Sequence, residues 1–116
     1  MGKYAWVEEF SGSVTVCDPE GIIIEMNEQA VAMFQKSGGK QLLGSNLLDC
    51  HPEPSRSKLK QLMDERQTNI YTIEKKGVKK LIYQAPWYIK GEYRGFVEMV
   101  IEMPASMPHF IRDASA

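Results

Sequence analysis

The chain has 116 residues, of which 43% are hydrophobic and 25% are charged, and its formal net charge is −1. These values are typical of one globular domain and do not indicate a disordered chain. The near balance of 14 basic and 15 acidic side chains gives no electrostatic reason to expect a nucleic acid or an anionic membrane as a partner.

The first part of the chain predicts a short helix followed by a β-hairpin. Residues 3–10 carry apolar side chains at the spacing of one helical face. Residues 13–18 are rich in β-branched side chains and predict a strand. Residues 18–21, Asp-Pro-Glu-Gly, predict a tight turn, after which residues 22–24 continue as a second strand.

Helical segments follow the hairpin. Asn27 can cap a helix by accepting hydrogen bonds from backbone amides of its first turn, and residues 37–39, Ser-Gly-Gly, predict where that helix ends. Residues 40–54 are interrupted by glycine and proline and suit one or two helical turns. Ser55 is expected to cap a longer helix that reaches Arg66.

Three strands complete the chain, over residues 69–76, 78–89 and 93–103, with hairpin-type turns between them. Pro86 cannot donate to a ladder of hydrogen bonds. We therefore expect it at a bulge or beyond the end of the pairing with its neighbouring strand.

Alternation along these strands defines two faces of the predicted sheet. One face is almost entirely apolar and carries Leu81, Tyr83, Ala85, Trp87, Val97, Met99, Ile101 and Met103. The other mixes apolar and polar side chains and carries Ile82, Gln84, Pro86, Tyr88, Phe96, Glu98, Val100 and Glu102. We expect the apolar face to point inward and the mixed face to be covered by the N-terminal helix or by a second subunit.

The order of two strands, short helices and three strands resembles that of the PAS family over roughly residues 12–103. The turn at residues 18–21, Asn27, the stretch Gly-Ser-Asn-Leu-Leu-Asp-Cys-His-Pro-Glu at residues 44–53, and Gly95-Phe96 carry the resemblance. Residues 49–52, Asp-Cys-His-Pro, are most similar to PAS domains that accompany hemerythrin-like metal-binding domains in some microbial proteins.

The resemblance implies an α+β fold with a five-stranded antiparallel sheet in the order 2-1-5-4-3 and short helices on one face. It divides the chain into a lead-in helix at residues 1–11, the domain at residues 12–103 and a tail at residues 104–116. It also implies a sensory or protein-interaction domain that forms a homodimer through the N-terminal helix and the outer face of the sheet. Its output would pass to a separate signalling protein, or the chain would be a piece of a larger sensor.

The interior of such a domain is either a filled core or an apolar pocket that binds a small ligand, and the sequence leaves both open. Our candidate pocket residues are Met33, Phe34, Leu47, His51, Leu62, Tyr71, Tyr83, Trp87, Val97 and Met99. Our candidate dimer-interface residues are Trp6, Val7, Phe10, Ile82, Tyr88, Phe96 and Val100.

His51 and Cys50 define an alternative function, a haem-based or redox-based sensor. Haem-binding PAS sensors typically place their histidine on the long helix, and residues 55–66 contain none. Flavin photoreceptors of the family need Asn-Cys-Arg-Phe, whereas Leu47 follows Asn46. The simpler interpretation is that His51 packs or hydrogen-bonds at the end of a helical turn and that Cys50 and Cys17 are buried. No cofactor is required, and no zinc-type cluster of Cys and His occurs.

The sequence carries no glycine-rich phosphate loop after a strand and no nucleophile elbow, so we expect no enzymatic activity. No apolar run approaches the roughly 20 residues that a membrane span needs, and the start lacks the apolar core of a signal peptide. The two cysteines sit in unlike contexts and are expected to be reduced, which favours the cytoplasm. The identity of a ligand and of the downstream partner stays open.

Overall fold

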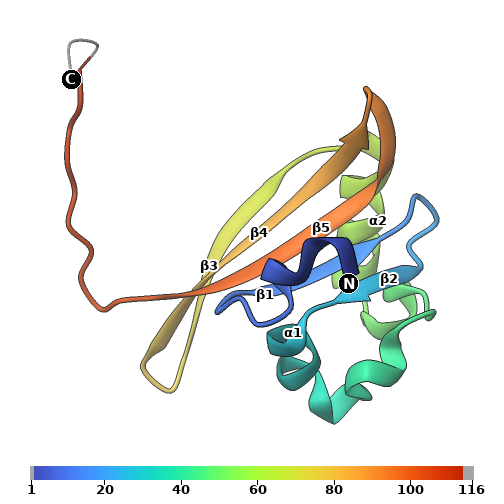
Figure 1. Cartoon of the computed structure of the whole chain (residues 1–116), viewed down its shortest axis with the longest axis horizontal. Helices are drawn as coiled ribbons and strands as arrows, with labels where there is room; N and C mark the ends of the chain where they lie inside the picture. The colour runs from blue at the N-terminus through green and yellow to red at the C-terminus, as the bar shows by residue number, and fades with distance from the viewer. Residues whose placement is uncertain (1, 114–116) are drawn as a thin grey trace.

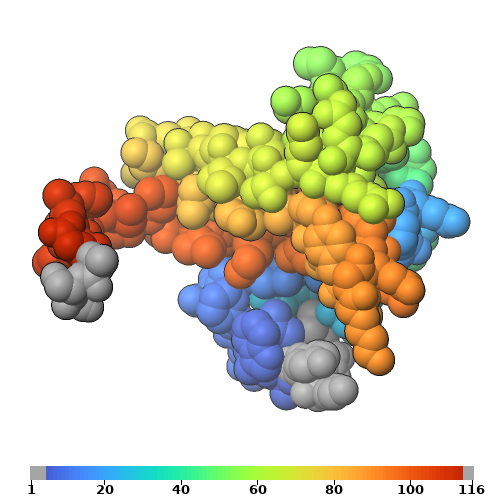
Figure 2. Space-filling view, turned by 90° about the horizontal axis from the view of Figure 1, so that it is seen from above, coloured from blue at the N-terminus to red at the C-terminus, as the bar shows by residue number. Residues whose placement is uncertain are grey.

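The computed structural model describes residues 2–113; Met1 of the predicted lead-in helix and residues 114–116 of the predicted tail lie outside the described residues. A five-stranded antiparallel sheet forms the centre, in the order β2-β1-β5-β4-β3. The N-terminal segment and α2 lie on opposite sides of this sheet (Figures 1 and 2). The predicted α+β class and strand order are confirmed. Residues 104–113 form neither helix nor strand and extend away from the sheet (Figure 1).

The N-terminal part follows the prediction, with one change of helix type. Gly2–Val7 forms a 3₁₀ helix, η1, shorter than the predicted helix. The hairpin consists of β1, Ser13–Cys17, and β2, Ile23–Met26. Its turn is held by the Asp18 carboxylate, which accepts hydrogen bonds from the backbone N–H groups of Glu20 and Ile22, both at 2.9 Å.

The helical region is more broken than predicted. It contains α1 at Glu28–Met33, η2 at Gln35–Ser37, η3 at Gly39–Leu42, η4 at Leu47–Cys50 and α2 at Ser55–Glu65. The predicted cap at Ser55 is wrong, because Ser55 is already the first residue of α2. The carboxylate of Glu53 instead accepts from the backbone N–H and the hydroxyl of Ser57, and these bonds hold the pKa of Glu53 below its usual value. Within residues 2–113, no helix is long and apolar enough to cross a membrane.

Three long strands complete the sheet: β3 at Asn69–Lys75, β4 at Val78–Ile89 and β5 at Glu92–Met103. The pairing of β3 with β4 ends at Asn69 and Gln84. Pro86 therefore lies beyond that pairing, as predicted, and its missing N–H interrupts no bond to β3.

Asn27 ties three segments together and is fully buried. Its side-chain oxygen accepts from the backbone N–H of Val14 at 2.9 Å and of Ala30 at 3.0 Å. Its amide group donates to the carbonyls of Val7 at 3.0 Å and Gly12 at 2.8 Å. The predicted helix cap is confirmed, and the same side chain also joins the N-terminal segment to β1.

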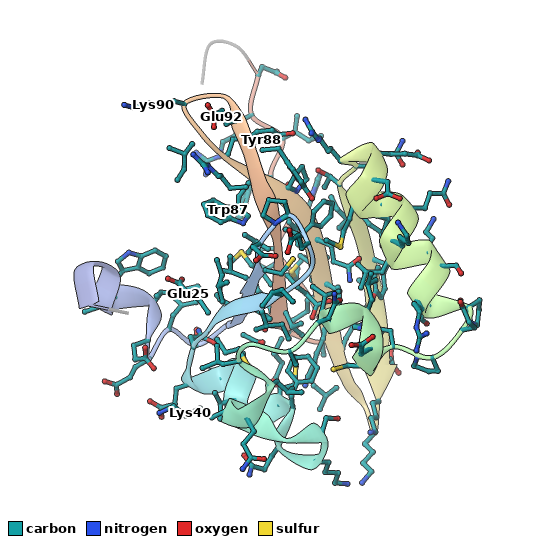
Figure 3. All side chains as sticks on the ribbon, turned by 90° about the vertical axis from the view of Figure 1, so that its right-hand side faces the viewer. Glu25, Lys40, Trp87, Tyr88, Lys90 and Glu92 are labelled. Atoms are coloured by element: carbon teal, nitrogen blue, oxygen red, sulfur yellow. The ribbon has the colours of Figure 1, made fainter. Side chains whose placement is uncertain are left out.

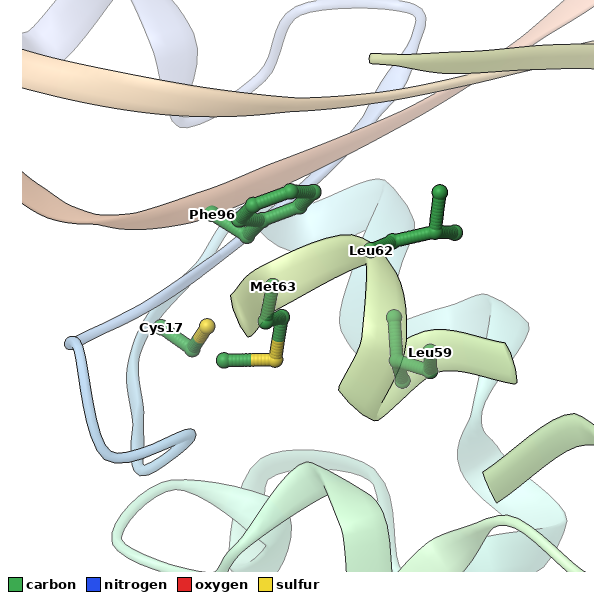
Figure 4. Packing of buried hydrophobic residues seen from close by; sticks show 5 residues of the cluster. All are labelled: Cys17, Leu59, Leu62, Met63 and Phe96. Carbon is green, nitrogen blue, oxygen red and sulfur yellow. The ribbon is translucent and has the colours of Figure 1, made fainter. Parts of the chain in front are cut away.

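The two faces of the sheet are the reverse of the prediction. Phe96 and Cys17 are paired across β5 and β1, and both pack against Leu59, Leu62 and Met63 of α2 (Figure 4). Residues whose side chains point to the same side of the sheet as Phe96 and Cys17 form its helix-facing side. These residues are Ser13, Thr15, Cys17, Asn69, Tyr71, Ile82, Gln84, Pro86, Phe96, Glu98 and Val100. The mixed face of the predicted sheet is therefore the one that meets the helices. The apolar face, which was predicted to point inward, is the outer face.

Burial removes four residues from the predicted dimer interface. Ile82, Phe96 and Val100 are buried on the helix-facing side, and Val7 is also buried. Tyr88 stays exposed at the end of β4 and contacts Tyr93 edge-to-face. Trp6 and Phe10 contact each other edge-to-face with ring centroids 6.0 Å apart.

Trp87 lies on the same side of the sheet as η1, away from α2 (Figure 3). Its indole N–H donates to the carbonyl of Cys17 at 3.1 Å, although β5 separates the two strands. The residue of β5 paired with Trp87 is Gly95, and a Cβ there would collide with the Cys17 carbonyl. Position 95 must therefore be a glycine for β5 to lie this close to the end of β1.

Replacing Asn27 by alanine is expected to lower the free energy of unfolding by about 3 kcal/mol, since it removes a helix cap and leaves buried backbone groups without partners. Urea denaturation measures the change. Gln29→Ala in α1 is the control, because Gln29 is exposed, and it should cost less than about 0.5 kcal/mol. Equal effects of the two substitutions would contradict the role of Asn27.

Candidate functional site

A cavity of about 150 Å³ lies between the helix-facing side of the sheet and the short helices. Its walls are mostly apolar and are formed by Cys17, Ile23, Met26, Phe34, Leu42, Leu47, Leu59 and Phe96. Short 3₁₀ helices form its roof because glycines at positions 38, 39 and 44, all with positive φ, break the chain into separate turns.

A row of polar side chains crosses the floor of this cavity. The side-chain amide of Asn69 in β3 donates to the side-chain oxygen of Gln84 in β4 at 3.0 Å. The amide of Gln84 in turn donates to the Glu98 carboxylate in β5 at 2.7 Å. Thr15 of β1 is the cross-strand neighbour of Glu98, and its buried hydroxyl oxygen has no hydrogen-bond partner among the described residues. The row therefore ends in a carboxylate and an unpaired hydroxyl.

An open groove between α2 and β3 adjoins the cavity. It is lined by His51, Pro54, Ser55, Lys58, Leu59, Leu62, Asn69, Tyr71, Gln84 and Glu98. Four of these, His51, Leu59, Gln84 and Glu98, also line the cavity. The shared residues place the groove directly beside the cavity.

His51 ends η4, and its ring is held by the backbone. Its Nδ1 lies 2.6 Å from the carbonyl oxygen of Leu47. A carbonyl only accepts, so Nδ1 carries the hydrogen, and in the neutral ring Nε2 is an acceptor. The interpretation that His51 hydrogen-bonds at the end of a helical turn is confirmed.

The two cysteines differ in environment. Cys17 is buried, as predicted, and its burial raises the pKa of its thiol. Such a thiol is held protonated and is a poor nucleophile. Cys50 is exposed, so the prediction that it is buried is wrong.

The candidate pocket residues are divided between several places. Phe34, Leu47, His51 and Val97 line the cavity, and Leu62, Tyr71 and His51 line the groove. Tyr83, Trp87 and Met99 lie on the outer face, and Met33 is exposed and lines neither.

Sequence reasoning missed the polar floor, Thr15, Gln84 and Glu98. It placed Glu98 on the mixed face of the predicted sheet, away from the interior. The signal that could have found the polar floor is the shared face of the sheet, because Gln84 and Glu98 lie on the same face as Phe96. Phe96 is an aromatic residue next to a glycine, and this combination favours a position in the core.

The cavity is too small for haem. A cavity of about 150 Å³ has the size of one that accepts benzene, whereas a porphyrin is several times larger. Among residues 2–113, no group of three or more His, Cys, Asp or Glu side chains could hold a metal ion. What the arrangement can do is enclose a compact apolar molecule and bind one polar group of it.

The family model for the PAS fold matches residues 4–94. The chain belongs to the PAS family. No curated protein matches the sequence. The resemblance of residues 49–52 to hemerythrin-associated PAS domains is not addressed by these matches and stays a prediction.

Solved PAS structures share the fold at low sequence identity. The PAS domain of BvgS from Bordetella pertussis has a TM-score of 0.65 at 16% identity, over 88% of this chain and 84% of that chain. The Aer2 receptor from Vibrio cholerae, described as a dual PAS-heme oxygen sensor, has a TM-score of 0.63 at 16% identity, over 80% and 95%. A sensory box sensor histidine kinase from Vibrio cholerae has a TM-score of 0.62 at 17% identity, over 90% of both chains. The fold is thus that of PAS sensor domains.

Proposed function

We propose that this PAS domain senses a small molecule that binds in the interior cavity and acts on a separate signalling protein by changing how the short helices pack on the sheet. The observation that carries the proposal is an apolar cavity lined by the Glu98 carboxylate and by the buried Thr15 hydroxyl, which has no hydrogen-bond partner among the described residues. A cavity of this composition is typical of a binding site with one orienting polar contact.

The roof of the cavity supports the second half of the proposal. It is built from 3₁₀ turns, which have poorer hydrogen-bond geometry than α-helix and open at low cost. Leu47 of η4 packs against both buried clusters of the core. A ligand that contacts Leu47 can therefore favour one packing of the roof over another, which is the energetic requirement for a signal.

Benzyl alcohol, an uncharged probe of suitable size, tests the ligand site. Titration into ¹⁵N-labelled protein should shift the amide resonances of Ile23, Leu47 and Leu59. Leu47→Trp fills the cavity and should weaken binding at least about tenfold, whereas Leu43→Trp should not, because Leu43 is exposed and lies outside the cavity lining. Shifts elsewhere in the protein, or equal binding by both variants, would contradict the site.

We further propose that the domain forms a homodimer through the outer face of the sheet. Large apolar side chains are exposed on or beside this face: Trp6 at 68%, Ile70 at 55%, Tyr83 at 40% and Ile101 at 38%. Tyr83 is paired with Ile70 on one side and with Met99 on the other, so the surface is continuous across three strands. Exposed apolar patches of this kind mark interaction surfaces.

Two isoleucines on opposite faces of β3 test the dimer. Ile70, on the outer face, is 55% exposed, and Ile73, on the helix-facing side, is 45% exposed. Ile70→Glu should raise the dimer dissociation constant at least about tenfold in sedimentation equilibrium, while Ile73→Glu should leave it unchanged. A wild-type monomer at high concentration, or equal loss in both variants, would refute the proposal.

A further inference from the structure

Glu98 is a partly buried carboxylate on the helix-facing side of the sheet. The Gln84 amide donates to one of its oxygens at 2.7 Å. Among the residues that the structure describes, ion pairs join Lys60 to Asp64 and Arg94 to Glu92, and neither involves Glu98. Carboxylates withdrawn from water are normally paired with a cation, and this one has none.

The groups around Glu98 can accept hydrogen bonds and do not neutralise its charge. Thr15, its cross-strand neighbour, has a buried hydroxyl without a partner. The Nδ1–H of His51 donates to the backbone carbonyl of Leu47, which leaves Nε2 as an acceptor in the neutral ring. Tyr71 responds to the same charge: burial first, and the negative charge of Glu98 second, raise the pKa of its phenol. Lys58 lines the groove, but it is exposed on α2 and makes no ion pair with Glu98.

The direction of the polar row also favours a ligand that donates. Asn69 donates to Gln84, and Gln84 donates to Glu98, so the hydrogen bonds of the row all point toward the carboxylate. A ligand that continues the row must offer hydrogen atoms to it. An ammonium group offers three and supplies the missing positive charge, and hydrogen bonds between ionised partners are the stronger kind.

The cavity sets the size of the rest of the molecule. Its volume of about 150 Å³ matches a benzene-sized body, and Phe96, Leu47 and Leu59 provide an apolar wall beside Glu98. We propose that the ligand is a small protonated amine with a compact apolar body, such as an arylalkylamine, whose ammonium group binds the Glu98 carboxylate. This inference rests on the proposed ligand function.

Three probes with the same ring separate the inference from the proposed function: benzylamine, benzyl alcohol and benzoate, titrated into ¹⁵N-labelled protein at neutral pH. Benzylamine should bind about tenfold more tightly than benzyl alcohol, a factor equal to about 1.4 kcal/mol, and benzoate should bind least. Glu98→Gln should remove the preference for the amine over benzyl alcohol. Glu102→Gln, the same substitution at an exposed position of β5, should change nothing.

Each other outcome overturns the inference in a recognisable way. If benzyl alcohol or benzoate binds the cavity as tightly as benzylamine, the ligand site stands and the amine class is wrong. If Glu98→Gln keeps the preference for benzylamine, Glu98 is not the recognising group. If no probe shifts the cavity resonances, the proposed ligand function fails together with the inference. The comparison of probes in the wild-type protein decides the question even if Glu98→Gln does not fold.

Discussion

The hydrogen bonds from Asn69 to Gln84 and from Gln84 to Glu98 determine how the interior of this domain is built. They allow a polar row to lie on the helix-facing side of the sheet, because each side-chain amide there bonds its neighbour across the strands. An ionised carboxylate at the end of the row cannot be covered by tight apolar packing without a partner. Part of the row lines the cavity beneath the short helices, together with Leu59 and Phe96 of the buried core.

The same strands connect the proposed ligand site with the proposed dimer surface. Side chains alternate along β5, so Glu98 faces the cavity while its neighbour Met99 carries its side chain on the outer face. Met99 is paired with Tyr83, one of the exposed residues of that face. In the proposed complex, a cation that displaces Glu98 would act on the outer surface through one peptide unit.

Most of the fold could be predicted from the sequence, because its signals are local. The turn at residues 18–21, the cap at Asn27 and the period-two pattern of β4 and β5 each depend on neighbouring residues only. Which face of the sheet meets the helices could not be predicted in this way. An all-apolar row containing Tyr83 suggests a core, whereas Gln84 and Glu98 suggest solvent. Only the pairing that brings Asn69, Gln84 and Glu98 together makes the polar row acceptable inside, and that pairing joins residues up to 29 positions apart.

The orientation of the polar row is tested most directly by nuclear Overhauser effects in the unliganded protein. The account predicts contacts between the side-chain amide protons of Gln84 and the methyl protons of Leu59, both of which line the cavity. It predicts none between the ring protons of Tyr83 and any methyl group of α2. Contacts from Tyr83 to Leu59 or Leu62, with the Gln84 amide exchanging freely with water, would contradict it.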